Sequence, residues 1–376
     1  MAELALQPMP AWRRAVLKVG SNLLAADGGG LTPVYAQALA AFIAASRAQG
    51  REVVLVSSGA VAAGRALQRA RAVPMGDLAE RQALAALGQA PMIALWQSLS
   101  PRPVAQVLLT HDDLRNRRRY LNARDTLRQL LAIDVLPVIN ENDTVAVDEL
   151  KLGDNDNLAA IVAALVDADL LLIASDIDAL YSADPRRDPA AAPISHVAEI
   201  TPEVLAMAGG SGSAVGTGGM RTKLQAAQKA AAAGIATALF NGRDATTVHA
   251  LGEGRLRGTL FIPGQSRMQA RKYWLLHAPG SMSSIRVDAG AASALAGGRA
   301  SLLPGGVAGA VGDFHRGDLV DIVDPAGHVV ARGLSQYGAV DVRRLAGRHS
   351  RDIDGLLGYS YGPAIVHRDD LALISP

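Results

Sequence analysis

The sequence of 376 residues contains no cysteine, which excludes disulfides, thiolate nucleophiles and cysteine-based zinc or iron–sulfur sites. Long apolar runs are also absent, because none reaches the roughly 18 residues that span a membrane. Residues 1–14 lack the apolar segment of a signal peptide. We therefore expect a cytoplasmic protein with no membrane partner.

Neither sign of charge is in excess, since 37 Lys and Arg residues stand against 35 Asp and Glu residues. The whole chain therefore gives no strong attraction to nucleic acid. Two nucleotide-binding motifs are missing as well. No Gly-Lys-Ser/Thr of a Walker loop occurs, and a G-x-G-x-x-G pattern starting at Gly216 would need glycine at Arg221. Any nucleotide site must belong to another class.

What the chain does contain is a regular alternation of strand and helix patterns over some 260 residues. Apolar strand-like runs lie at 15–19, 52–56, 104–109, 135–139, 169–174 and 236–240, and helical patterns lie between them. Thr32 and Pro33 have the composition of a helix start, and Gly50 that of its end. The order predicts an α/β fold, a three-layer αβα sandwich with a mainly parallel open sheet and ligands at the carboxyl ends of the strands.

The pattern breaks between residues 263 and 282, so we predict a first domain over 1–262, a linker over 263–282 and a second domain over 283–376. In the last part, short β-like runs at 285–288, 308–314, 319–323, 329–334 and 363–367 alternate with Gly-rich turns. This pattern predicts a small β-barrel-like or sandwich domain.

The stretch from Gly216 to Lys223 precedes an alanine-rich helical run. Glycine N–H groups and a helix N-terminus together suit a phosphate group, although most glycine-rich turns before helices bind nothing. Lys18 ends an apolar strand, where it is either an exposed surface lysine or a partner of that phosphate. Two lysines, a glycine-rich loop and a Mg²⁺ ion on the phosphate oxygens would suit phosphoryl transfer.

Six motifs in the same order resemble the amino-acid kinase family, and within it the bacterial kinases that phosphorylate glutamate. They are Lys18-Val-Gly-Ser21, Val56-Ser-Ser-Gly-Ala-Val-Ala-Ala-Gly64, Leu121-Asn-Ala-Arg-Asp-Thr126, Pro137-Val-Ile-Asn-Glu-Asn-Asp143, Gly153-Asp-Asn-Asp-Asn157 and Gly216-Thr-Gly-Gly-Met-Arg-Thr-Lys223. The part from Ser283 onward resembles the PUA domain that these kinases often carry. The resemblance implies ATP-dependent phosphorylation of the glutamate side-chain carboxylate, the first committed step of proline biosynthesis.

The resemblance also implies residue roles. Lys18 and Lys223 would contact the ATP phosphates, and Asp156 would hold the two lysines in place. Ser58, Asp143 and Asn155 match glutamate-binding positions. The nucleotide-binding positions are Lys18, Ser175, Asp176, Thr217, Gly218, Gly219, Met220, Arg221, Thr222 and Lys223. No metal-binding side chain is predicted; Mg²⁺ is expected with ATP. Because a carboxylate is already ionised at neutral pH, no general base is needed.

Several alternatives stay open at this point. The resemblance further implies inhibition by proline, near 140–151, and assembly into a homodimer or homotetramer. PUA domains of other proteins bind RNA, so the chain could be an RNA-binding or RNA-modifying protein; basic residues lie at 343–351, with little aromatic surface for base stacking. Another carboxylate or carbamate could also be the phosphate acceptor.

Overall fold

The computed structural model describes residues 4–25, 30–68, 78–146, 155–208, 219–266, 272, 275–276, 283–298 and 300–374. The chain divides into two compact units, the first mainly of residues 1–266 and the second mainly of residues 267–376. Among the described residues, no helix is long and apolar enough to cross a membrane. The domain boundaries at 262 and 283 stay predictions.

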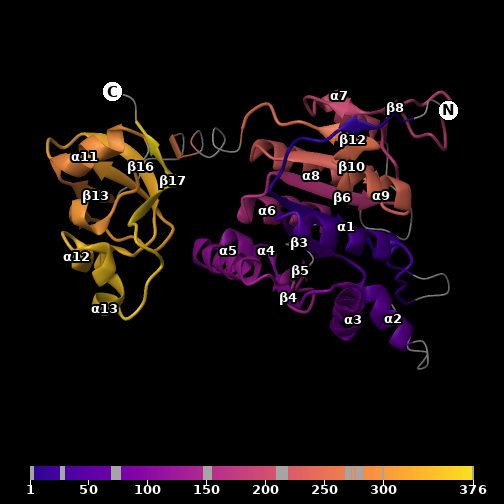
Figure 1. The fold of residues 1–376 in the computed structure, drawn as a ribbon, viewed down its shortest axis with the longest axis horizontal. Helices are drawn as coiled ribbons and strands as arrows, with labels where there is room; N and C mark the ends of the chain where they lie inside the picture. Colours follow the sequence, from indigo (N-terminus) through magenta and orange to yellow (C-terminus); the bar gives the residue numbers. More distant parts are fainter. Residues whose placement is uncertain are drawn as a thin grey trace. The chain divides into compact units, whose positions relative to one another are not determined.

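The centre of the first unit is a sheet that has eight strands among the described residues, in the order β4-β5-β3-β2-β6-β10-β12-β9 (Figure 1). The first six run parallel, which confirms the mainly parallel sheet. They are β2 (Arg14–Val19), β3 (Glu52–Ser57), β4 (Val104–Leu109), β5 (Leu136–Glu141), β6 (Leu170–Ser175) and β10 (Ala236–Asn241). Antiparallel to them, β12 (Gly258–Phe261) pairs with β10, and β9 (His196–Val197) completes the edge.

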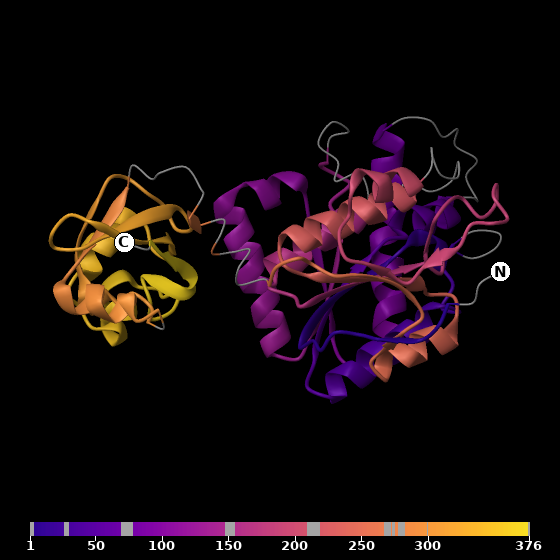
Figure 2. The ribbon, with the colours of Figure 1, turned by 90° about the horizontal axis from the view of Figure 1, so that it is seen from above.

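Helices cover both faces of this sheet, which gives the predicted three layers (Figure 2). The apolar side chains of α1 (Ala36–Ala48), α3 (Leu78–Leu99) and α9 (Ala245–Gly252) form one core with Leu17 and Leu55. Successive strand side chains point to opposite faces. Lys18 therefore points to the other face, where α6 (Asn155–Leu165) and α8 (Met220–Ala232) pack against each other.

The other elements of the first unit are shorter or peripheral. They are β1 (Gln7–Pro8), the 3-10 helix Ser21–Leu23, α2 (Ala60–Gln68), α4 (His111–Arg115), α5 (Arg117–Ala132), β7 (Leu180–Tyr181), β8 (Pro193–Ile194), α7 (Pro202–Met207) and β11 (Arg255–Leu256). The helix predicted to start at Pro33 begins at Ala36 instead. Its expected cap, Thr32, accepts a hydrogen bond from the Val34 N–H at 3.3 Å and so forms a local turn before the helix.

Helices α2 and α3 cross in unusually close contact because each has a glycine at the crossing. A Cβ atom on Gly64 would lie 2.0 Å from the Leu84 carbonyl oxygen, and one on Gly88 would lie 1.7 Å from that of Ala60. No other residue fits at such distances. The crossing fixes the start of α2, which follows directly after Ser58 and Gly59.

The second unit contains a five-stranded sheet in the order β14-β13-β15-β16-β17. All neighbours are antiparallel except β13 and β15. Its elements are β13 (Ser284–Val287), α11 (Ala289–Ala296), the 3-10 helix Pro304–Gly306, β14 (Val307–Val311), β15 (Leu319–Val323), β16 (Val329–Ser335), α12 (Ala339–Leu345), the 3-10 helix Ser350–Asp352, α13 (Ile353–Leu357) and β17 (Val366–Leu373). The last predicted strand, 363–367, thus lies three to six residues too early.

Candidate active site

Polar residues from several of the sequence motifs share one edge of the first unit. Lys18 lies in β2, Ser58 follows β3, Asn140 is the next-to-last residue of β5 and Ser175 ends β6. Since these strands are parallel neighbours, their carboxyl ends lie side by side. The first turns of α6 and α8 bring Asp156 and Lys223 to Lys18 at this edge.

An ion-paired triad lies at the centre of this edge. The Lys18 Nζ lies 2.5 Å from Asp156 Oδ1, and the Lys223 Nζ lies 3.0 Å from Asp156 Oδ2. Asp156 is completely buried, and each lysine is only 5% exposed. The Thr222 hydroxyl lies 3.0 Å from Asp156 Oδ2 and 2.8 Å from the Gly219 carbonyl oxygen. Asp156 thus holds two ammonium groups from different elements next to each other.

The electrostatics of the triad keep Asp156 ionised. Burial by itself raises the pKa of a carboxyl group, but the charges of Lys18 and Lys223, and their hydrogen bonds, hold the pKa of Asp156 well below its ordinary value. With two ammonium groups and one carboxylate, the triad has a net charge of about +1. It therefore places positive charge at the carboxyl ends of the parallel strands.

A second cluster joins Ser58, Asn140 and Asn155. The Asn155 side-chain amide donates to the Ser58 Oγ at 2.7 Å and to the Asn140 Oδ1 at 2.9 Å. Ser58 and Asn155 were predicted together from the sequence, whereas Asn140 was not given a role. Its position at the end of β5, in a motif already singled out, was the signal for it. Asp143 lies in the turn after β5 and is half-buried; its place beside a ligand stays a prediction.

The predicted nucleotide residues are only partly described. Thr217 and Gly218 lie outside the described residues. Gly219 is the extended N-cap residue of α8, Met220 begins the helix, and Arg221 is exposed. Lys223 is therefore one turn into a helix whose N-terminal N–H groups point to the same edge.

Ser175 and Asp176 meet residues that the sequence analysis missed. The Asn22 amide donates to Asp176 Oδ2 at 3.0 Å, and Arg243 donates to the Asn22 carbonyl oxygen at 3.2 Å. Burial raises the pKa of Asp176, but the Asn22 hydrogen bond and the charge of Arg243 lower it by more. The pKa of Asp176 therefore lies below its ordinary value. Arg243 lies two residues after the carboxyl end of β10, so the rule that ligands bind at strand ends could have identified it.

Among the described residues, no group of three or more His, Asp or Glu side chains could hold a metal ion. Mg²⁺ needs no such cluster when it enters with a nucleotide, since it then keeps phosphate oxygens and waters as ligands. Both carboxylate oxygens of Asp156 contact lysines, so Asp156 is not placed to bind a metal.

Comparison with known proteins decides which family this site belongs to. The model of the amino acid kinase family matches residues 13–241. The chain belongs to the amino acid kinase family. The PUA domain model matches residues 283–357 of the same chain. Both expected family resemblances are thereby confirmed.

Several curated members of the family are close relatives over nearly the whole chain. Glutamate 5-kinase of Xanthomonas euvesicatoria pv. vesicatoria (strain 85-10) is 68% identical over 96% of this chain and all of its own length. Glutamate 5-kinase of Xylella fastidiosa (strain M12) is 65% identical over 98% of this chain and 97% of its own. Among solved structures, UMP kinase from Bacillus anthracis aligns with 68% of this chain and 98% of its own at 15% identity, with a TM-score of 0.46.

Proposed function

We propose that this chain is an ATP-dependent kinase that phosphorylates the side-chain carboxylate of L-glutamate to L-glutamyl 5-phosphate, the first step of proline biosynthesis. The observation that carries the proposal is the start of α6. Asn155 contacts the Ser58 cluster, and the next residue, Asp156, contacts both lysines. A site for a carboxylate acceptor and a site for a phosphate donor therefore meet at consecutive residues.

The acceptor carboxylate is already the nucleophile. One of its oxygens forms a bond to the γ-phosphorus of ATP while the bond from that phosphorus to the β,γ-bridging oxygen breaks, giving the acyl phosphate and ADP. No proton has to be removed, because a glutamate side chain is ionised at neutral pH. What remains for the protein is to align the two substrates and to neutralise charge on the transferring group.

Lys18 and Lys223 supply that positive charge. Their ammonium groups contact the two different carboxylate oxygens of Asp156. Without this negative charge, the two buried positive charges would repel each other. We assign Lys18, Ser175, Asp176 and the segment Thr217 to Lys223 to nucleotide binding. Mg²⁺ would enter on the phosphates and add further positive charge there when bound.

Ser58, Asp143 and Asn155 are assigned to glutamate. Because Asn155 donates to the Ser58 Oγ, the hydroxyl hydrogen of Ser58 can still be donated to a carboxylate oxygen. Asp143 would pair with the substrate ammonium group. Inhibition by proline at overlapping residues and assembly into a homodimer or homotetramer belong to the same proposal.

The test is trapping of the acyl phosphate. The purified chain is incubated with ATP, Mg²⁺ and hydroxylamine, and with L-glutamate, L-aspartate or carbamate as acceptor. We expect hydroxamate from glutamate and none from aspartate, whose shorter side chain does not reach the transferring phosphate. A stronger product signal with aspartate or carbamate would overturn the assigned acceptor.

RNA binding by the second unit is the other candidate function, and one observation favours it. The sequence predicted little aromatic surface there, but Tyr359 and Tyr361 are 39% and 47% exposed, and their ring centroids lie 5.2 Å apart. The Arg316 guanidinium lies 3.7 Å from the Tyr361 ring centroid. Exposed aromatic rings and an arginine suit unpaired bases, which stack on such side chains. Filter binding of single-stranded RNA to the wild type and to Tyr361→Ala tests it; equal binding would exclude this surface.

A further inference from the structure

A cavity of about 290 Å³ lies on the face of the sheet opposite the ion-paired triad. Its walls come from α1, the end of α3, the segment before β4 and the start of β5; they include Ala40, Ile43, Ala44, Trp96 and Leu136. Small-molecule sites begin at about 300 Å³. The cavity is therefore of a size for a ligand with a few carbon atoms, and too small for a nucleotide.

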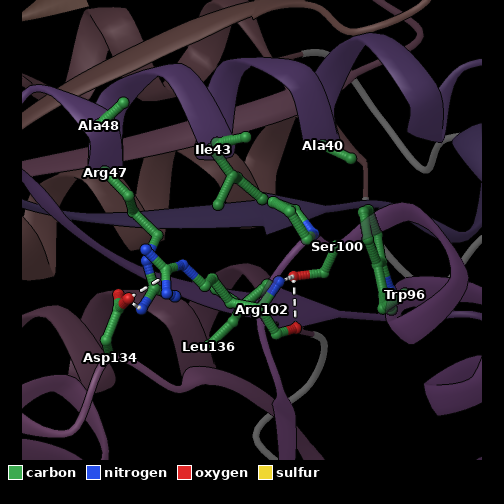
Figure 3. A pocket seen from close by; sticks show the side chains of 11 residues that line it. Ala40, Ile43, Arg47, Ala48, Trp96, Ser100, Arg102, Asp134 and Leu136 are labelled. Atoms are coloured by element: carbon green, nitrogen blue, oxygen red, sulfur yellow. Dashed lines mark hydrogen bonds and ion pairs between the residues drawn. The ribbon is translucent and has the colours of Figure 1, made fainter.

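The charged groups of the cavity gather at one end. Figure 3 shows the guanidinium groups of Arg47 and Arg102 meeting Asp134 there, while the indole of Trp96 forms the other end. Arg47 Nη2 lies 2.5 Å from Asp134 Oδ1, and Arg102 Nε lies 3.0 Å from Asp134 Oδ2. Two arginines face one carboxylate, so this end retains a net positive charge.

One donor at this end lacks an acceptor. The Arg47 Nη1 atom is buried and has no hydrogen-bond partner in the part of the chain that the structure describes. The Arg47 side chain is only 12% exposed, whereas that of Arg102 is 62% exposed and can turn. Leaving a buried guanidinium N–H without an acceptor costs folding free energy. This nitrogen has no accessible surface of its own, so an acceptor reaches it only when the exposed Arg102 side chain turns and opens this end of the cavity to a ligand carboxylate.

An arginine–aspartate pair is not by itself evidence of a binding site, because the first unit contains a second such pair. Asp134 and Asp167 both follow a helix with left-handed backbone, at φ values of 59° and 55°, and Asp167 pairs with Arg128. What distinguishes Asp134 is the second arginine, the unpartnered Arg47 nitrogen and the adjoining apolar cavity. Arg128 is thus a natural control.

We propose that this cavity binds a small monocarboxylate with a compact apolar body, its carboxylate on Arg47 and Arg102 and its hydrocarbon part against Ile43, Leu136 and Trp96. The site is separate from the catalytic edge. Arg102 and Asp134 precede β4 and β5, at the amino ends of these strands, whereas the candidate catalytic residues lie at the carboxyl ends.

The test is calorimetric titration of the full chain with 3-methylbutanoate, and with the uncharged 3-methylbutanamide as the matched ligand. We expect saturable binding of the acid at one site. The amide should bind about tenfold more weakly or worse, because the charge-assisted hydrogen bonds are lost. Equal affinities for acid and amide, or no saturable heat from the acid, would overturn the proposal.

Variants locate the binding. Arg47→Met and Arg102→Gln should each weaken it about tenfold, and Arg128→Met should leave it unchanged. Ala44→Leu fills the cavity and should abolish binding, whereas Ala45→Leu, on the exposed face of the same helix, should not. If the Ala44→Leu variant and the Arg102→Gln variant both bind the acid with wild-type affinity, the acid binds elsewhere and the assignment is wrong. This test is independent of kinase activity.

Discussion

Asp156 is the residue on which the candidate site depends most. It has no exposed surface and contacts two ammonium groups, so its loss leaves two buried positive charges side by side. We expect Asp156→Asn to lower kcat by at least about 10²-fold and the free energy of unfolding by about 3–5 kcal/mol. Steady-state kinetics and urea unfolding measure the two effects.

The control for this variant is Asp184→Asn. Asp184 also contacts two cations, Arg186 and Arg187, but in a solvent-exposed turn. Its loss should leave both kcat and stability close to those of the wild type. An Asp156→Asn enzyme that turns over like Asp184→Asn would remove Asp156 from the mechanism.

The pH dependence of stability follows from the lowered pKa of Asp156. The pKa in the unfolded chain is about 3.9, and the folded value lies below it. The carboxylate therefore adds stability that is fully present above about pH 4 and is lost as the pH falls further. The difference in unfolding free energy between wild type and Asp156→Asn should stay constant from about pH 5 to 8 and shrink below about pH 4. A difference that already falls between pH 7 and 5 would show that another group titrates.

At the scale of elements, the α2–α3 crossing links the fold to the acceptor site. Gly88→Ala would place a Cβ atom 1.7 Å from the Ala60 carbonyl oxygen, so the helices must separate. We expect a loss of about 1–3 kcal/mol or more in stability, and a raised KM for glutamate because Ser58 lies just before α2. Thermal unfolding and kinetics measure both.

Gly252→Ala is the matched variant, since an added Cβ there meets nothing within 4 Å. It should keep the wild-type KM and gain about 0.4–1 kcal/mol of stability. If Gly88→Ala unfolds at the wild-type temperature, the crossing is less tight than described.

The sequence predicted elements best where pattern alone determines them. The strands at 104–109 and 319–323 have the observed bounds because apolar runs there end at clear turn residues. Strand β17 was missed in part because Val366–Leu373 carries four charged or histidine residues, His367, Arg368, Asp369 and Asp370, in a row. Its pairing with β16 overrides that local composition.

The candidate site shows the same division. The family resemblance was enough to predict Lys18, Asp156 and Lys223 as one group, whereas the strand pattern by itself predicted only that ligands bind at the carboxyl ends of the strands. The hydrogen bonds from Asn22 to Asp176 and from Arg243 to Asn22 join residues more than 150 positions apart, and no local pattern reveals these pairings. The arginine pair of the cavity beside α1 depends likewise on tertiary packing, which brings Arg47 of α1 to Arg102 and Asp134.

At the scale of the whole molecule, the two units have separate cores. Leu17, Phe42 and Phe240 belong to one, and Phe314 and Tyr337 to the other. We expect calorimetry to resolve two unfolding transitions. ATP with glutamate should raise the midpoint temperature of the first unit's transition and leave that of the second unit unchanged. A single transition that shifts as a whole would show that the units unfold together.

The central claim is that a glutamate carboxylate oxygen attacks the γ-phosphorus of ATP. It is tested most directly with L-glutamate carrying ¹⁸O in both side-chain carboxylate oxygens, with hydroxylamine releasing phosphate from the product. Because hydroxylamine attacks the carbonyl carbon, the bridging oxygen leaves with phosphorus. The account predicts one ¹⁸O atom in each phosphate released, read by mass spectrometry. Phosphate without the label would mean that water, not glutamate, accepts the phosphoryl group, and would contradict the account.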